Sequence, residues 1–437
     1  MYLAILGYGL VIIMIAGLLK SKLTPLVAFC ILPPIFGMLA GYNLIELAGF
    51  VVDGVSGTLN SAALCLFATT YFGIMTEQGL FDPAVNFLSK KAGGNVVAIT
   101  VITSLIAAIS HMDTGMTSTM LVTIPAMLPI YKRFKIRPEI MFLLIAQSVA
   151  VINLLPHGGG LVRVSGVTGL DISLIFSTIA PVIPIMMIYN VAFAAFIGKR
   201  EKIRIAAGQN AAVYDNLAES DRKVDLREVK INLRYVLNLG LTILILVAMF
   251  MNLFRSYFVF MMGLGLALII NYKTVKEQND AIKQFAANAY PIGVIMLASG
   301  ILVGIMGETG MLSAMAGVIT GLIPESLKSF YTLIIGFLSL PLSMALGADG
   351  FYYGLTPLFV EVGASYGVPV ISLASIMILA RDAVGCITPV SAVSYLAPGL
   401  LGVELKDMMK FSFKYLFVFF CIEVVVCLVL GILPFVS

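Results

Sequence analysis

The motif Gly73-Ile74-Met75-Thr76-Glu77-Gln78-Gly79 returns later in the chain as Gly304-Ile305-Met306-Gly307-Glu308-Thr309-Gly310, at an offset of 304 − 73 = 231 residues. Gly9-Leu10 returns as Gly240-Leu241 at the same offset, 240 − 9 = 231. Asn153-Leu154-Leu155-Pro156 is matched in place by Cys386-Ile387-Thr388-Pro389, at 389 − 156 = 233. A duplication of this length, with helix-breaking residues at corresponding places, is typical of secondary transporters built from two repeats.

The composition indicates a protein that lies in a membrane. Hydrophobic residues make up 60% of the chain and charged residues 11%, with a mean hydropathy of +1.04, against about 25% charged residues in soluble domains. Apolar runs of ~18 to 20 residues recur, which is the span of a transmembrane helix, whereas a membrane barrel needs alternating strands. The first run, 2–19, has no cleavage site after it and is predicted to be retained. We therefore predict an all-α, multi-pass protein of the cell membrane.

The predicted domains are two repeats joined by a charged stretch. Repeat 1 is predicted over 1–197, a cytoplasmic linker over 198–232, and repeat 2 over 233–437. The spans expected in repeat 1 are 3–19, 24–42, 58–80, a re-entrant hairpin at 95–131, a broken span at 139–168, and 172–197. Those expected in repeat 2 are 233–251, 254–271, 287–309, a hairpin at 327–360, a broken span at 371–398, and 412–434. The stretches 82–91 and 275–287 are predicted to be short amphipathic helices at the inner surface.

The basic residues predict the orientation of these spans. If each hairpin enters and leaves on one face, each half crosses the membrane about five times, and this odd number inverts one half relative to the other. With both termini outside, the predicted outer segments 43–57 and 361–370 hold no Lys or Arg, as the positive-inside rule requires. The inner loops then hold all 27 Lys and Arg residues except Arg163, Arg255, Lys328 and Arg381.

Polar side chains concentrate in four interruptions of the apolar segments, two at hairpin tips and two in broken helices. Pro removes a backbone donor and Gly permits an unwound chain, and lipid cannot satisfy the backbone groups that are freed. We therefore predict one substrate and ion site where the interruptions meet, with half-helix N-termini for an anion and freed carbonyls for a cation. Its candidate residues are Ser110, Asp113, Thr114, Gly115, Thr117, Asn153, His157, Gly158, Gly159, Asp349, Gly350, Thr388, Pro389 and Ser391.

Ionisable residues inside spans are functional candidates, because each costs roughly 2.5 to 3.5 kcal/mol on insertion scales. Asp113 and Asp349 are interpreted as ligands of a coupling cation or as proton carriers; the alternative is that each caps the half-helix after it. His111 and His157, the only histidines, could bind substrate or relay a proton, or could be structural.

Two arginines in the spans could clamp a carboxylate. The guanidinium of Arg163 or of Arg381 could donate two hydrogen bonds to one carboxylate. For Arg381, an ion pair with the adjacent Asp382 is the alternative. Glu77 and Glu308 are interpreted as structural, because the whole motif around them recurs as a packing unit would.

Several of these motifs resemble one family. They are Phe72-Gly73-Ile74-Met75, Gly79-Leu80-Phe81-Asp82-Pro83, Met127-Leu128-Pro129-Ile130-Tyr131-Lys132-Arg133, Asn153-Leu154-Leu155-Pro156 with Gly158-Gly159 and Arg163, Leu346-Gly347 with Asp349, Phe351-Tyr352 with Gly354 and Pro357, and Gly402-Val403-Glu404-Leu405. Over essentially the whole chain the sequence resembles the citrate-metal:proton symporter family of the ion transporter superfamily. The resemblance implies symport of a small, citrate-like carboxylate, a transport domain that moves like an elevator against a scaffold, and a homodimer formed through that scaffold.

The first hairpin tip departs from the family pattern. The family has Asp-Gly-Asp-Gly followed by hydroxyl residues, whereas this chain has Met112-Asp113-Thr114-Gly115-Met116-Thr117, and His157 stands where the family has Trp. One fewer carboxylate leaves fewer hard ligands, which argues against a divalent metal entering with the substrate. The Ser-Asn-Thr motif of the related sodium-dicarboxylate transporters is absent from both tips, and the coupling ion is expected to be H⁺ or Na⁺.

Other functions remain open at this point. A cation/proton antiporter of the same superfamily is one alternative, and an ion channel or a transport-inactive receptor is another. The expected partners are the carboxylate and membrane lipid, with no nucleic acid and no further cofactor. No nucleophile-base pair, metal-ligand cluster or nucleotide loop is recognised, and an enzyme is therefore not predicted.

Overall fold

A computed structural model describes the chain except residues 21, 92–93, 211–230, 252–253, 323–324, 389–393, 395 and 435–437. The described residues form helices and no strand, and the all-helical prediction is confirmed. Seven of their helices are long and apolar enough to cross a membrane. Shorter apolar helices, among them Pro138–Ile152 and Ser256–Asn271, accompany them.

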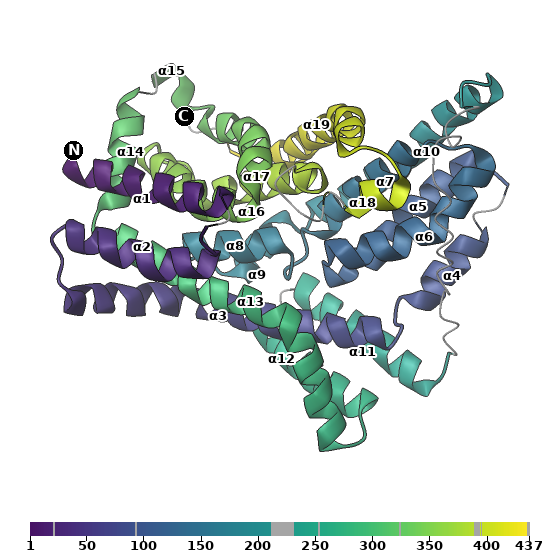
Figure 1. The fold of residues 1–437 in the computed structure, drawn as a ribbon, viewed down its shortest axis with the longest axis horizontal. Coiled ribbons are helices and arrows are strands. Elements are labelled where there is room, and N and C mark those ends of the chain that lie inside the picture. Colours follow the sequence, from purple (N-terminus) through teal and green to yellow (C-terminus); the bar gives the residue numbers. More distant parts are fainter. Residues whose placement is uncertain are drawn as a thin grey trace.

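Figure 1 shows the helices in chain order. The first are α1 (Tyr2–Leu19), α2 (Pro25–Leu39), α3 (Leu44–Glu77), α4 (Asp82–Lys91), α5 (Val96–Ser110), the 3-10 segment η1 (His111–Asp113), α6 (Met116–Phe134), α7 (Pro138–Ile152), α8 (Gly159–Thr168), α9 (Ile172–Ile179) and α10 (Val182–Ala206). After residues 211–230 come α11 (Leu233–Phe250), α12 (Ser256–Asn271), α13 (Val275–Glu308), α14 (Met311–Leu322), α15 (Glu325–Lys328), α16 (Tyr331–Ser365), α17 (Val370–Val384), η2 (Gly385–Ile387), α18 (Leu396–Leu401) and α19 (Leu405–Val429).

The helix boundaries repeat at the offset of the sequence motifs. Helices α1 and α11 begin 233 − 2 = 231 residues apart, and α3 and α13 both begin and end 231 residues apart. The inversion of one half relative to the other, and the division into repeats at 197 and 233, stay predictions.

Helices α3 and α13 are longer than predicted. Each has 34 residues, so the expected outer segment 43–57 and the expected surface helix 275–287 are parts of continuous helices. The cause is a capping box at each start, in which Asn43 pairs with Glu46 and Thr274 with Glu277. These reciprocal side-chain bonds satisfy the first backbone donors and begin the helix well before the apolar run.

Two other boundaries differ from the prediction. The span expected at 172–197 is broken between α9 and α10, where Pro181 cannot donate a backbone hydrogen bond. Helix α10 then continues to Ala206, inside the expected linker. Its end is held because Arg137 donates to the buried Glu201 carboxylate, at 2.8 Å from Nη2 to Oε2.

The helices α3 and α13 cross backbone to backbone. A Cβ atom on Gly304 would overlap the Phe50 carbonyl oxygen, and one on Gly54 would overlap the Gly300 carbonyl oxygen. Small residues are what allow two membrane helices to approach this closely. Gly73, the matching motif residue on α3, faces the Phe285 ring of α13. The recurring motif is therefore a packing element between these two helices.

Both expected hairpins are pairs of helices that fold back on themselves. The Thr103 and Tyr131 hydroxyl oxygens lie 3.1 Å apart between α5 and α6, and the Tyr331 hydroxyl donates to the Phe359 carbonyl oxygen at 3.0 Å within α16. A straight helix would separate residues 28 apart by about 42 Å. The chain of α16 therefore reverses, and it does so at Gly347, whose φ of 69° and ψ of −178° are not helical.

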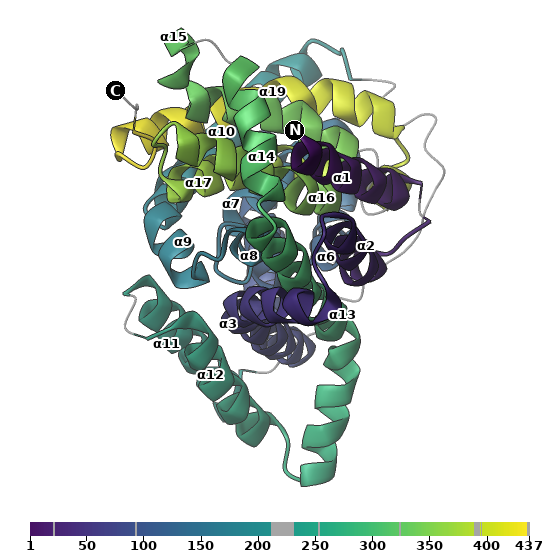
Figure 2. The same cartoon turned by 90° about the vertical axis from the view of Figure 1, so that its left-hand side faces the viewer.

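Helix α8 lies in the middle of this bundle. It contacts α3, α13, α16 and α17, and Figure 2 shows it surrounded by other helices. Helices α11 and α12, with the first turns of α13, project from the body of the molecule (Figures 1 and 2). The central position of α8 matters because its N-terminus is one side of the first helix break.

Candidate functional site

The four irregular stretches predicted from the sequence meet inside the bundle. The first tip, η1, contacts α3 and α7, and the second break, η2, contacts α7 and α16. Helix α8, which follows the first break, contacts both α16 and α17. Each break thus lies against the other half's elements, and the candidate residues can be examined as one region.

The tip of the first hairpin folds around the Asp113 carboxylate. The Gly115 backbone N–H donates to Oδ1 at 2.8 Å, and the Ser118 hydroxyl donates to Oδ2 at 2.7 Å. Thr114 adopts a left-handed backbone, with φ of 53°, and its hydroxyl donates to the Asp113 carbonyl oxygen. Both oxygens of Asp113 thus bond residues at the start of α6, although no side chain caps the first amides of that helix, and Thr117 is exposed.

A buried histidine ties this tip to the first broken helix. The His111 Nε2 atom lies 3.0 Å from the Asn153 side-chain oxygen, and Nδ1 lies 2.7 Å from the Thr119 hydroxyl oxygen. Both ring nitrogens are therefore used, and Asn153, directly after α7, is held toward the tip. The neighbouring Ser110 hydroxyl is buried and has no hydrogen-bond partner among the described residues.

The first helix break requires glycine at residue 158 and places His157 against the first hairpin tip. A Cβ on Gly158 would collide with the Asn153 carbonyl oxygen, so only glycine fits this turn. His157 Nε2 donates to the Met112 carbonyl oxygen at 2.9 Å, and its ring stacks on Phe72 with centroids 4.4 Å apart. The Nδ1 atom of His157 is buried without a partner among the described residues.

Arg163 and Asp349 form an ion pair between α8 and the second hairpin tip. The Arg163 Nε–H donates to Asp349 Oδ1 at 2.8 Å, and Nη1 donates to the Gly159 carbonyl oxygen at 3.0 Å. The two side chains keep 24% and 35% of their surface exposed, respectively. The candidate cation ligand Asp349 is thus bound to the candidate carboxylate clamp, and Gly350 beside it is buried.

The second break is described only as far as Thr388. The Thr388 hydroxyl is buried and donates back to the Val384 carbonyl oxygen at 3.1 Å, whereas Pro389 and Ser391 lie outside the described residues. Arg381 is buried, and its Nε has no partner within the described part of the chain. None of the ion pairs that join described residues links Arg381 to Asp382, so the expected adjacent ion pair is not formed.

The sequence reading missed part of this region. Tyr352, Asp382 and Gly160 were not among the candidate residues, yet the Tyr352 hydroxyl and Asp382 Oδ2 are buried without partners among the described residues. Both lie against Gly160 in the first turn of α8. For Asp382 a signal was available, because it is a carboxylate inside an apolar helix. For Tyr352 there was none, since tyrosine is common in apolar segments.

The arrangement combines groups that can bind an anion with buried polar atoms that have no partner among the described residues. The guanidinium of Arg163 and the first turn of α8 favour negative charge. Buried polar atoms without partners in a folded protein call for an explanation, and a bound ligand is one. Those in this region are Ser110 Oγ, His157 Nδ1, Tyr352 Oη, Arg381 Nε and Asp382 Oδ2.

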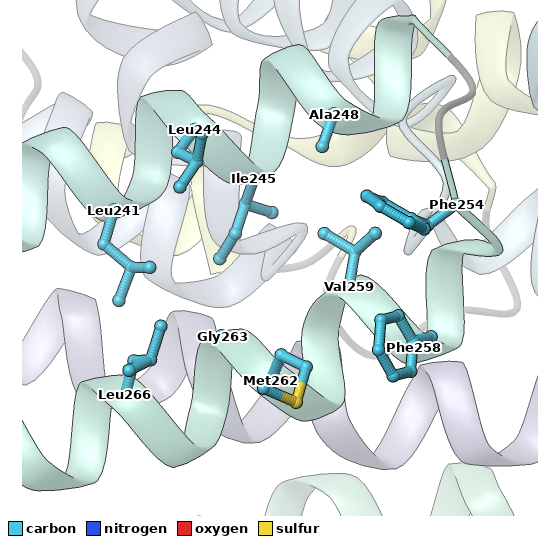
Figure 3. Close-up of a pocket in the computed structure, with 10 residues that line it drawn as sticks. All are labelled: Leu241, Leu244, Ile245, Ala248, Phe254, Phe258, Val259, Met262, Gly263 and Leu266. Atoms are coloured by element: carbon cyan, nitrogen blue, oxygen red, sulfur yellow. The ribbon is translucent and has the colours of Figure 1, made fainter.

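Within the described part of the chain, neither a metal-ligand cluster nor the apolar pocket between α11 and α12 offers another site. The described residues include no group of three or more His, Cys, Asp or Glu side chains placed to hold a metal ion. A pocket of about 230 Å³ lies between α11 and α12, and Figure 3 shows apolar residues such as Leu241, Phe254 and Met262 around it. It offers no polar side chain to a carboxylate.

The helical bundle, with two paired hairpins and two broken helices meeting at a polar centre, defines a multi-pass membrane protein of the transporter class. The chain belongs to the citrate transporter family, whose family model matches residues 8–380.

Curated relatives agree with this assignment, and a solved structure has a similar fold. The chain is 30% identical to the uncharacterized transporter YraO of Bacillus subtilis (strain 168), over 94% of this chain and 95% of that protein. It is 29% identical to the citrate transporter of the same organism, over 99% and 100%, and 27% identical to its Mg²⁺/citrate complex secondary transporter, over 98% of each. The crystal structure of the Alcanivorax borkumensis YdaH transporter, described as having an unusual topology, matches with a TM-score of 0.65 over 90% of each chain. At 13% identity this likeness shows the fold alone.

Proposed function

We propose that this protein is a secondary active transporter that moves a small, citrate-like carboxylate across the membrane together with H⁺ or Na⁺. Family membership and the relatives named for citrate transport support the substrate class. The observation that carries the proposal is the ion pair of Arg163 and Asp349, which places a partly exposed guanidinium between a broken helix and a hairpin tip.

In this proposal a substrate carboxylate binds where Asp349 now binds. Asp349 occupies the Nε side of Arg163 and is itself a carboxylate, which supports a substrate carboxylate at this position. The first backbone amides of α8, from Gly159 onward, add positive potential to the same place, whereas the Gly158 N–H already donates to the Leu155 carbonyl oxygen at 2.7 Å. Arg163 is the principal anion contact, and Asp349 is the internal group that the substrate displaces.

We propose that the substrate enters without a bound divalent metal. Both oxygens of Asp113 are engaged within the first tip, and Asp349 is engaged by Arg163. Only Asp349, once displaced from Arg163 by the substrate, could then bind a cation, and a single carboxylate offers few of the hard ligands that such a cation takes. One relative is named for the Mg²⁺/citrate complex, so added metal must be compared with a chelator in any uptake measurement.

The transport cycle is proposed to follow alternating access, with an elevator-type movement in a homodimer that has both termini outside and residues 198–232 inside. Sequence duplication and the basic residues of the inner loops support this scheme. Cysteine labelling of single-cysteine variants at Tyr2 and Lys202, with a reagent that does not cross membranes, tests the orientation. Labelling of residue 202 but not of residue 2 in intact cells would mean that the protein has the opposite orientation in the membrane.

Uptake into proteoliposomes tests the function. Radiolabelled citrate and malate are supplied under an imposed proton or sodium gradient, with Mg²⁺ or with a chelator. We expect accumulation above the outside concentration under one of the two gradients, with the chelator present. Ion exchange without carboxylate uptake would instead indicate an antiporter, and currents without uphill accumulation would indicate a channel.

A further inference from the structure

Of the three carboxylates at the candidate site, only Asp382 keeps a buried oxygen without a hydrogen-bond partner among the described residues. Asp113 accepts two hydrogen bonds within its tip, and Asp349 is bound by Arg163. Asp382 is 6% exposed, and its Oδ2 has no partner in that part of the chain. A buried ionised carboxylate without a partner is unfavourable, and this is more so at membrane depth.

A second unpartnered group faces the same place. The Tyr352 hydroxyl, from the second hairpin, is 1% exposed and also lacks a partner among the described residues. A Cβ atom built on Gly160 would lie 2.8 Å from the Tyr352 oxygen and 3.3 Å from Asp382 Oδ2. The two oxygens therefore flank the first turn of α8, at a position where only glycine leaves them room.

The charged and titratable groups around Asp382 act in opposite directions. Arg163 on α8 and the neighbouring Arg381 lie within electrostatic range of Asp382 and carry positive charge. Glu423 on α19 is a second carboxyl group within electrostatic range. The other titratable groups that face it are Tyr352 on α16 and Cys386 on η2. Helix α9 has no ionisable side chain, and α7 has only Glu139, in its first turn.

The position of Asp382 also links its charge to substrate binding. When ionised, it places a negative charge beside the start of α8, where the proposed substrate carboxylate binds next to Arg163. When it takes up a proton, that repulsion disappears and the anion is bound more favourably. Binding of one proton to Asp382 and binding of the carboxylate thus favour each other, which is what symport requires.

We propose that Asp382 binds the coupling proton, with the Tyr352 hydroxyl as its hydrogen-bond partner when protonated and Gly160 keeping the space between them open. The inference rests on the proposed function and names its coupling ion and the residue that carries it. The Asp382 side chain takes up the proton from the side of the membrane on which substrate binds. It gives up the proton to the side on which substrate is released.

Two transport modes in proteoliposomes test this assignment with Asp382→Asn, which imitates the protonated form. Net citrate uptake driven by a pH gradient should fall by about tenfold or more, because no proton can be carried. Exchange of labelled for unlabelled citrate needs no net proton movement and should fall by less than about threefold. The pH dependence of exchange should also become flatter than in the wild type. Glu139→Gln is the matched control, since the Glu139 carboxylate, in the first turn of α7, also has a buried oxygen, Oε2, without a partner among the described residues. It should retain uptake driven by the pH gradient.

The outcomes separate the two levels of the proposal. Wild-type vesicles that accumulate no carboxylate under any gradient would overturn the proposed function. Accumulation by Asp382→Asn equal to that of the wild type, or dependent on sodium alone, would overturn the role of Asp382 only. If the variant does not fold, calorimetry of citrate binding to the wild type in two buffers of different ionisation enthalpy decides the matter. Binding of about one proton for each citrate bound supports the inference if Asp382→Glu also binds that proton. Binding of citrate without a proton overturns the inference.

Discussion

Arg163 and Asp349 lie 186 residues apart in the chain, and 2.8 Å separates the Nε of one from the Oδ1 of the other. The contact joins a helix break of the first half to a hairpin tip of the second. Neither half of the chain therefore contains the whole of the candidate site.

Replacement of Arg163 by lysine tests the carboxylate contact. Lysine keeps the charge but lacks the planar fork, so we expect kcat/KM for citrate uptake to fall by about tenfold or more. Initial rates in proteoliposomes measure it. Asp349→Asn is the companion variant. If Asp349 is displaced by substrate, this variant lowers KM or leaves it near the wild-type value, and a complete loss of uptake would make Asp349 a direct ligand instead.

Asp113→Asn distinguishes a cap from a cation ligand. Asparagine keeps one side-chain acceptor for the Gly115 N–H or the Ser118 hydroxyl, so we expect the hairpin to form and at least about half of the uptake to remain. Asp113→Ala removes both acceptors and should lower stability by about 1 kcal/mol. Abolished uptake in a well-folded Asp113→Asn protein would instead assign the carboxylate to ion binding.

The first break depends on the absence of a side chain at residue 158. Gly158→Ala brings a Cβ into the Asn153 carbonyl oxygen, and we expect loss of uptake together with a lower melting temperature in detergent. Gly57→Ala in α3 is the control, because its added Cβ meets no atom within 4 Å. An alanine in a helix interior is favoured over glycine by roughly 0.5–1 kcal/mol, so that variant should be as stable as the wild type or more so. If the two variants were equally stable, the close contact between residue 158 and the Asn153 carbonyl oxygen would be refuted.

The crossing of α3 and α13 gives a further matched pair. Gly304→Ala should destabilise the protein by about 1–3 kcal/mol, since the Phe50 carbonyl oxygen already occupies the space of the new methyl group. Gly307→Ala, three residues later on the same helix, meets no atom within 4 Å and should be neutral. Thermal unfolding followed by tyrosine fluorescence compares them, and a stable Gly304→Ala protein would mean that the crossing is looser than described.

The fold was largely predictable because glycine and proline interrupt apolar runs at recognisable places. The two hairpins turn at the tips that Asp113 and Gly347 predicted, and the first break falls at Gly158. The starts of α3 and α13 were missed, since the capping boxes at Asn43 and Thr274 override the hydropathy that set the predicted ends. Pro389 and Ser391 lie outside the described residues, so their assigned roles stay predictions.

The pairings within the site were not predictable in the same way. Sequence reasoning selected Arg163 and Asp349 separately, as a clamp and a cation ligand, because each is an ionisable residue in a span. That they bind each other depends on how α8 crosses the second hairpin, and no local pattern encodes this crossing. The same holds for Tyr352, whose hydroxyl is notable only once Gly160 and Asp382 are seen beside it.

The backbone contact of α3 with α13 has a mechanical consequence. At Gly54, Gly300 and Gly304 there are no side chains that could rotate and let one helix slide along the other. The two 34-residue helices are therefore expected to behave as one stiff strut during the transport cycle. We expect movement to occur instead between α8 and the second hairpin, where one polar contact can be replaced by another.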